Sequence, residues 1–126
     1  METLEQKRAR FALDSVNSVI PKAKEERTKY KTQLLKLPAR LHSNGLGQTV
    51  AFYLSAGKDK PEWAICDWLD DWLKNREIYP KNQDLIHSIA GKNLNGDPEA
   101  TYREASAEVR ALAVWLKRFA EAFLGD

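Results

Sequence analysis

The sequence has few of the residues that enzymes use for chemistry. Cys66 is the only cysteine in 126 residues, and His42 and His87 are the only histidines. A single cysteine excludes a disulfide within the chain and a cysteine-rich metal site. Neither histidine belongs to a metal-binding spacing such as HExxH, and neither lies near Cys66 in the sequence. We therefore predict no metal and no cofactor, and we expect Cys66 to pack as a small apolar side chain.

Long hydrophobic runs are also missing. No stretch reaches the roughly 18 consecutive apolar residues of a membrane-spanning helix, so no membrane partner is expected. The opening segment METLEQKRARFALDSV lacks the continuous apolar core and the small-residue cleavage site of a secretory signal. We expect residues 1–126 to form a single helical domain, because the chain is too short to build two ordinary cores. Since membrane-spanning and secretory segments are not found, we expect the protein in the cytoplasm.

Charge is unevenly distributed along the chain. Residues 1–60 hold 12 Lys and Arg against 6 Asp and Glu, whereas residues 61–126 hold 8 against 12. A basic half joined to an acidic half can bind a polyanion on one face and a basic partner on another. The alternative is that both halves are ordinary solvated helix surfaces.

Apolar residues recur at helical spacing through the first third of the chain. Steps of three and four connect Ala9, Leu13, Val16, Ile20, Ala23, Arg27, Tyr30, Leu34, Leu37 and Leu41. Pro21 lies inside this stripe, but the phase continues through it. We therefore expect a kink or a tight break there without a change of direction. A boundary is predicted at Leu37–Pro38, where Pro38 would open a short new turn.

The rest of the chain also predicts helices. Shorter ones are expected over residues 46–57, 61–74 and 82–90, each next to a glycine or proline. Asp97 and Pro98 form a cap for a last helix that could extend to Leu124, with an apolar stripe at Tyr102, Ala105, Val109, Leu112, Leu116, Phe119 and Phe123. The predicted fold class is all-α: a single-domain bundle with long N-terminal and C-terminal helices and shorter helices between them.

One acidic cluster resembles a catalytic constellation. Asp67, Asp70 and Asp71 lie on one helix face, as the carboxylates of a two-metal nuclease would. Trp68 and Trp72 supply the apolar face of the same helix, so these carboxylates fall on the side that must be solvated. We expect ion pairing with a lysine rather than catalysis, and we predict that the protein is not an enzyme.

The first long helix carries basic residues in two rows. Lys22, Lys29 and Lys36 lie within about 40° of one another and are roughly 10 Å apart, within reach of alternate phosphates on an extended strand. Lys24, Arg27 and Lys31 form a second row. Such rows are typical of sequence-independent RNA binding, although a solvated helix face has the same pattern. The candidate RNA-binding residues are Lys22, Lys24, Arg27, Lys29, Lys31, Lys36 and Arg40.

Glycines punctuate the segment Asn44-Gly45-Leu46-Gly47-Gln48. The segment fails as a dinucleotide-binding loop, because no third glycine and no preceding strand accompany it. We expect Gly45 to cap one helix in a left-handed conformation and Gly47 to let the next helix lie close to a neighbour.

The segment from Leu37 to Tyr53, LPARLHSNGLGQTVAFY, resembles the signature of the Cmr-type small subunit of type III-B CRISPR effector complexes. The matching positions are Leu37, Pro38, Asn44, Gly45, Leu46, Gly47, Gln48, Ala51, Phe52 and Tyr53. The opening (Gln6, Ala9, Phe11 and Ala12) and the helical plan also match, so the resemblance covers nearly the whole chain.

The resemblance implies a non-catalytic subunit for antiviral defence. In that family several copies stack beside a filament of a backbone protein that holds the guide RNA, and other subunits cleave the target RNA. The implied partners are other copies of the chain, the backbone and large Cmr subunits, and the guide and target RNA. The family signature designates no basic RNA contact, so the basic rows are a separate prediction. A helical adaptor that binds only protein is the alternative function.

Overall fold

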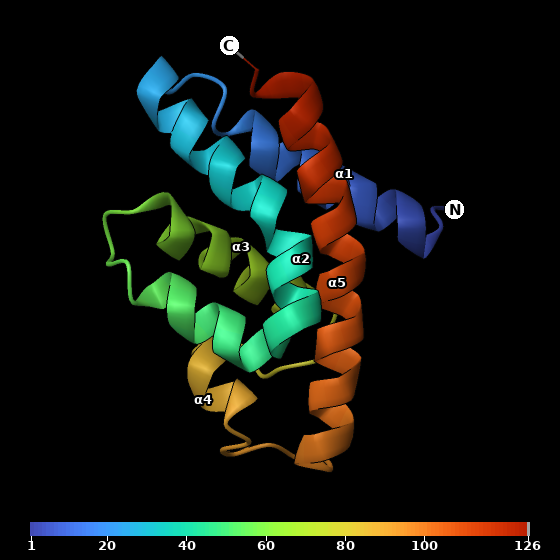
Figure 1. Ribbon diagram of the computed structural model, residues 1–126. Helices are drawn as coiled ribbons and strands as arrows, with labels where there is room; N and C mark the ends of the chain where they lie inside the picture. The colour runs from blue at the N-terminus through green and yellow to red at the C-terminus, as the bar shows by residue number, and fades with distance from the viewer. Residues whose placement is uncertain (126) are drawn as a thin grey trace.

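The structure, a computed structural model, describes residues 1–125, which form five helices joined by turns. These are α1 (Leu4–Asn17), α2 (Lys24–Leu54), α3 (Pro61–Asn75), α4 (Leu85–Ile89) and α5 (Pro98–Phe123). No strand occurs among residues 1–125, and no helix there is long and apolar enough to cross a membrane. Figure 1 shows α5 along one side of the molecule, with the other helices stacked against it. The all-α fold class is confirmed.

Helix α5 organises the core, because it packs against both α1 and α2. The predicted stripe along α5 is buried at Ala105, Val109, Leu112 and Leu116. Phe123, in the last turn of α5, was expected to join them but is 49% exposed. The fully buried core side chains from the other helices include Val16, Leu34, Leu37, Leu46, Tyr53, Ile65, Leu69 and Leu73.

The starts of the later helices follow their local capping signals. Pro61 is the first residue of α3, and the Asp97 carboxylate accepts a hydrogen bond from the Glu99 amide (3.2 Å) at the start of α5. Helix α4 begins at Leu85 rather than at the predicted Asn82. Its cap is Asp84, which accepts from the His87 amide at 2.9 Å.

The break predicted near Pro21 is present, but the prediction that the chain keeps its direction there is wrong. Helix α1 ends at Asn17 and α2 begins at Lys24, with turns between them. Figure 1 shows α1 running toward the upper left and α2 starting there and running back down across the molecule. Ala23, placed in the apolar stripe by the sequence, is exposed at the N-terminal cap of α2. The chain changes direction here although the hydrophobic phase continues.

The predicted boundary at Leu37–Pro38 is also wrong. Pro38 lies inside α2, where the helix tolerates the lost backbone donor. The interruption instead falls at Gly45, with φ 80° and ψ 170°, which only glycine adopts readily. Beyond it the second part of α2 folds back, because the Tyr53 hydroxyl donates to the Gln33 carbonyl oxygen at 2.9 Å. Helix α2 therefore forms a V with Gly45 at its vertex.

A buried carboxylate ties three helices together. Glu108 of α5, 6% exposed, accepts two hydrogen bonds from Arg8 of α1 (2.8 and 2.9 Å) and one from the Trp72 indole of α3 (3.0 Å). The hydrogen bonds from Arg8 lower the pKa of Glu108, and burial only partly opposes them. Bidentate Arg–carboxylate pairs of this kind are directional, so they fix α1 and α3 against α5.

Candidate nucleic-acid interface

The basic residues of α2 flank its buried stripe on opposite sides. Tyr30, Leu34, Leu37 and Leu41 form that stripe, which faces the core. At about 100° per residue, Lys29, Lys36 and Arg40 fall on one flank of it, within about 40° of one another. Lys24, Arg27 and Lys31 fall on the other flank. We call the first set the Lys29 face and the second the Lys24 face.

Lys22 does not belong to the row that the sequence predicted, because it precedes α2. Its ammonium group lies 5.9 Å from the Tyr30 ring centroid, and its carbonyl oxygen accepts a hydrogen bond from Arg27 (2.6 Å). Two of the predicted RNA-binding residues therefore also hold the turn between α1 and α2. On the Lys29 face, Lys29 pairs loosely with Glu26 (3.6 Å), while Lys36 is exposed.

A groove of about 340 Å³ lies inside the V of α2, next to the Lys29 face. Its walls come from the first part of α2 and from the turn that leads into α3. The lining residues are Thr28, Lys29, Thr32, Gln33, Ala56, Lys60, Pro61 and Glu62. Two ammonium groups, several hydroxyl and amide groups and one carboxylate line it, so its balance of charge favours an anionic ligand.

Arg40 extends this surface from the groove toward the vertex of the V. Its guanidinium group donates to the Gln33 side-chain oxygen (2.6 Å) and to the Tyr53 hydroxyl (3.2 Å). The same group lies 5.1 Å from the Phe52 ring centroid and 5.4 Å from that of Tyr53. Tyr53 is fully buried, whereas Phe52 is 59% exposed. The sequence predicted Arg40 as a candidate but gave Phe52 no role.

The glycine segment serves the packing of the fold, as the sequence predicted. Gly45 provides the left-handed vertex of α2, and the Gly47 amide donates to the Tyr102 hydroxyl of α5 at 2.9 Å. A Cβ at Gly47 would lie 3.3 Å from Ile89 and 3.4 Å from the Tyr102 hydroxyl, so the helices approach too closely for a larger residue. Leu46 is buried. Asn44 and Gln48, the polar ends of the segment, are exposed.

The cysteine, aspartate and histidine side chains that the sequence offered for catalysis have ordinary structural surroundings. Cys66 is buried, and burial raises the pKa of its thiol to about 12. Asp67 and Asp71 are exposed, while Asp70 is half-buried and pairs with Lys74 at 3.0 Å. Among residues 1–125, no group of three or more His, Cys, Asp or Glu side chains has the geometry to hold a metal ion. His42 and His87 are both exposed.

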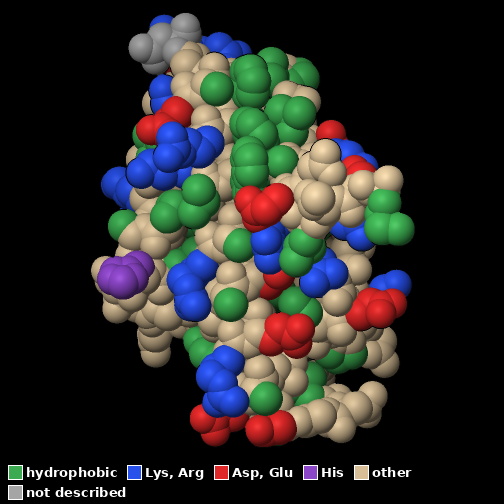
Figure 2. Space-filling view, turned by 90° about the vertical axis from the view of Figure 1, so that its right-hand side faces the viewer, with side chains coloured by type: hydrophobic (Ala, Val, Ile, Leu, Met, Phe, Trp, Pro, Cys, Tyr) green, Lys and Arg blue, Asp and Glu red, His purple; other side chains and the backbone are tan. Residues whose placement is uncertain are grey.

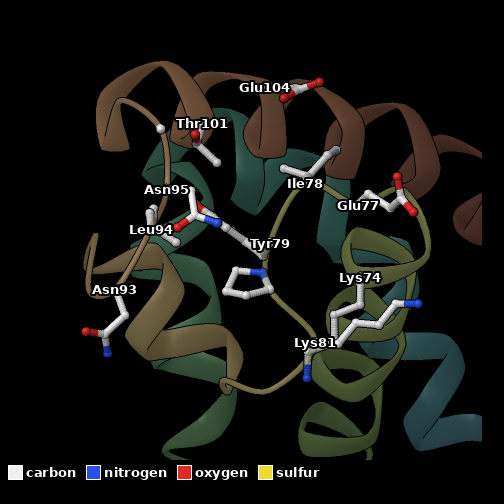
Figure 3. A pocket seen from close by; sticks show the side chains of 12 residues that line it. Lys74, Glu77, Ile78, Tyr79, Lys81, Asn93, Leu94, Asn95, Thr101 and Glu104 are labelled. Carbon is white, nitrogen blue, oxygen red and sulfur yellow. The ribbon is translucent and has the colours of Figure 1, made fainter.

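A second hollow, of about 440 Å³, lies between the end of α3 and the start of α5 (Figure 3). Lys74 and Lys81 line it together with Glu77 and Glu104, so its charges balance and favour neither sign of ligand. Lys74 is also engaged by Asp70. This hollow could not be predicted from the sequence, because its walls come from separate turns.

A third surface is apolar and lies on the C-terminal half of α5. Figure 2 shows hydrophobic side chains gathered in a column on the upper part of this side of the molecule. Val114 is 50% exposed, and Trp115, Phe119 and Phe123 form a row with ring centroids 5.6 and 6.1 Å apart. Exposed apolar surface of this kind is typical of protein–protein contacts. The sequence predicted the stripe but not its exposed end.

Comparison with known proteins identifies the family. A family model described as CRISPR-associated protein (Cas_Cmr5) matches residues 4–123. The chain belongs to the Cmr5 family of CRISPR-associated proteins. It is 32% identical over 102 residues, 81% of each chain, to the CRISPR system Cmr subunit Cmr5 of Thermus thermophilus. The crystal structure of a CRISPR-associated Cmr5 family protein from the same species matches it with a TM-score of 0.76 at 30% identity, covering 99% of this chain and 100% of that one.

The family assignment confirms the resemblance that the segment from Leu37 to Tyr53 predicted. The match with the Thermus thermophilus structure spans the whole fold, so the V of α2 and its packing on α5 belong to a known arrangement. Most of the matching block from Asn44 to Tyr53 builds that arrangement, and Phe52 is its large apolar residue left in solvent.

Proposed function

We propose that this chain is the small subunit of a Cmr CRISPR effector complex, that it has no catalytic activity of its own, and that it contacts RNA through the Lys29 face of α2. The observation that carries the RNA contact is the groove in the V of α2, lined by Lys29 and Lys60 and continued by Lys36 and Arg40. Lysine and arginine side chains neutralise phosphates without reading sequence, which suits a subunit that meets many different targets.

The Cmr family name supports the assignment to a complex, because the matching relative is named as a Cmr subunit. We propose that several copies of this chain stack side by side with the backbone and large Cmr subunits in the cytoplasm. In this arrangement the basic half of the chain faces RNA. The acidic half and the apolar end of α5 face protein partners. The Lys24 face is a second RNA-contacting candidate on the opposite flank of α2.

The charge-reversal variant Lys29→Glu/Lys36→Glu tests the RNA contact. The complex is purified from its native cells through this chain, and its affinity for single-stranded target RNA is measured over a range of salt concentrations. We expect weaker binding and a flatter plot of log affinity against log salt, by about 0.7 for each phosphate that is no longer neutralised. Lys7→Glu/Lys92→Glu is the matched control, because both lysines are exposed elsewhere and the charge change is equal. An unchanged slope in the first variant would remove the Lys29 face from the interface.

The second candidate function is a helical adaptor that binds only protein. The row of Trp115, Phe119 and Phe123 on α5, which ends in the exposed Phe123, favours it, since aromatic residues are enriched at protein interfaces. Ultraviolet crosslinking of RNA within the purified complex separates the two functions. An adaptor would yield no RNA crosslinked to this chain.

A further inference from the structure

Phe52 lies in the second part of α2, where Val50 and Tyr53 are buried, yet Phe52 itself is 59% exposed. The adjacent Tyr53 is fully buried, and its hydroxyl donates to the Gln33 carbonyl oxygen. Burial of a phenylalanine side chain contributes strongly to the stability of a small core, but the exposed Phe52 makes little of this contribution. The exposed side chain of Phe52 is therefore available for contact with a ligand.

Arg40 beside it is held in place by neutral partners. Its guanidinium nitrogen bonds the Gln33 side-chain oxygen (2.6 Å) and the Tyr53 hydroxyl (3.2 Å), both of which are neutral. No carboxylate forms an ion pair with it among residues 1–125. The cation lies 5.1 Å from the Phe52 ring centroid, so an aromatic ring and a positive group share one small surface.

This surface continues the basic row of α2. Arg40 lies one helical turn beyond Lys36, and Lys29 lies two turns before Lys36, so the three cations span roughly 16 Å along one flank. Gln33 and Ala56 line the groove of the V, and Phe52 precedes Ala56 by only four residues. The groove and the Phe52 ring are therefore parts of one continuous surface.

We infer that Phe52 and Arg40 form a stacking site for one base of a single-stranded RNA whose phosphates lie along Lys29 and Lys36. This inference rests on the proposed RNA contact of α2. A base stacks on an aromatic ring or on a guanidinium plane whatever its identity, and the adjacent cations hold the backbone. The site thus selects for single-stranded nucleic acid, because bases within a duplex are already stacked.

The surroundings of Phe52 favour RNA over a protein partner. Its exposed neighbours along the chain, Gln48, Ala51 and Ser55, are small or polar. Arg40 lies across the V, one helical turn beyond Lys36. A stable protein contact needs a contiguous apolar patch, such as the one on α5, rather than one ring among cations.

The direct test is photocrosslinking of the purified complex to single-stranded target RNA that carries 4-thiouridine. The tryptic peptide over residues 41–58, which ends at Lys58 and contains Phe52, is expected to carry a nucleotide adduct at Phe52. Phe52→Ala is expected to abolish this adduct and weaken RNA binding about tenfold, whereas Phe52→Trp should restore both. Ile20→Ala, which truncates an exposed apolar side chain outside both proposed surfaces, is the control and should leave the adduct unchanged.

The variants also separate this inference from the proposed function. If Lys29→Glu/Lys36→Glu flattens the salt dependence while Phe52→Ala changes neither the adduct nor the affinity, the RNA contact stands and the stacking site is wrong. If Phe52→Ala instead releases the chain from the complex at unchanged thermal stability, Phe52 is a protein contact and the inference is overturned. Arg40→Lys keeps the charge but loses the planar group, so a partial loss of the adduct is expected.

Discussion

Helices α2 and α5 are the two longest in the molecule, and they use their exposed faces differently. Helix α2 is bent at Gly45 and carries cations on both flanks of its buried stripe. Helix α5 runs through 26 residues, buries a carboxylate near its middle and exposes the apolar side chains of Val114 and Phe123 in its C-terminal half. A bend creates a concave basic groove, while a straight helix gives a flat apolar strip. The first shape suits a flexible anionic strand, and the second suits another folded surface.

The largest expected effect concerns the buried carboxylate of α5. Glu108→Ala leaves Arg8 and the Trp72 indole without their partner, and breaking a buried ion pair typically costs about 3–5 kcal/mol of unfolding free energy. We expect about 3 kcal/mol here, the lower end, because Arg8 retains its bond to Glu5 (2.6 Å). Urea denaturation at neutral pH measures the change. Glu99→Ala, which removes an exposed carboxylate paired with Arg103, is the control and should change stability by about 0.5 kcal/mol or less.

The second-largest expected loss of stability is at the bend of α2. Gly45→Ala forces a residue with a Cβ into φ 80° and ψ 170°, which costs on the order of 1–3 kcal/mol. Because Gly45 forms the vertex of the V, the variant should also reduce RNA binding by the complex. Gly96→Ala is the control, since a Cβ there would meet only the Thr101 hydroxyl at 3.9 Å. Equal stability of the two variants would show that the bend does not depend on glycine.

The difference between the two helices also explains what the sequence could predict. Helix α5 was predicted accurately because its start depends on local signals, Asp97 and Pro98, and its stripe has one phase throughout. The change of direction before α2 was missed because Val16 and Tyr30, both buried, keep the same hydrophobic phase on either side of it. Periodicity reports which face is buried but not whether the axis continues.

The candidate site was predictable only in part, because periodicity does not report how the helix axis runs. The cations of α2 are visible in the sequence, but the groove needs the contact of Tyr53 with Gln33, twenty residues earlier in the chain. The exposure of Phe52 depends on the same contact. Glu108 carried a usable signal, since it lies three residues after Ala105 and four before Leu112, on the buried side of α5. A charged residue on an apolar stripe predicts a buried partner.

The unfolding free energy that the protein loses on acidification through Glu108 is expected to be smaller than the loss in Glu108→Ala. The pKa of Glu108 is lower in the folded protein than its ordinary value of 4.5, because Arg8 hydrogen-bonds its ionised form. The carboxylate therefore contributes stability above pH 4.5 and loses this contribution as the pH falls through the lower, folded-state pKa. Urea denaturation at neutral and acidic pH should show that wild type loses more stability than Glu108→Gln. Equal losses would mean that the ion pair does not control acid stability.

The smallest expected effect on stability is the most informative about the two surfaces. Val114→Lys adds a charge to the exposed apolar end of α5, where Val114 is 50% exposed, so the unfolding free energy should change by about 0.5 kcal/mol or less. If this strip meets a protein partner, a lysine there must be desolvated, and less of the variant should co-purify with the other subunits. RNA crosslinking per copy retained should not change, because α2 is untouched. Lys36→Glu should show the reverse, with normal retention and reduced crosslinking. If both variants lose retention and crosslinking together, the two surfaces meet the same partner and the division of roles between α2 and α5 is wrong.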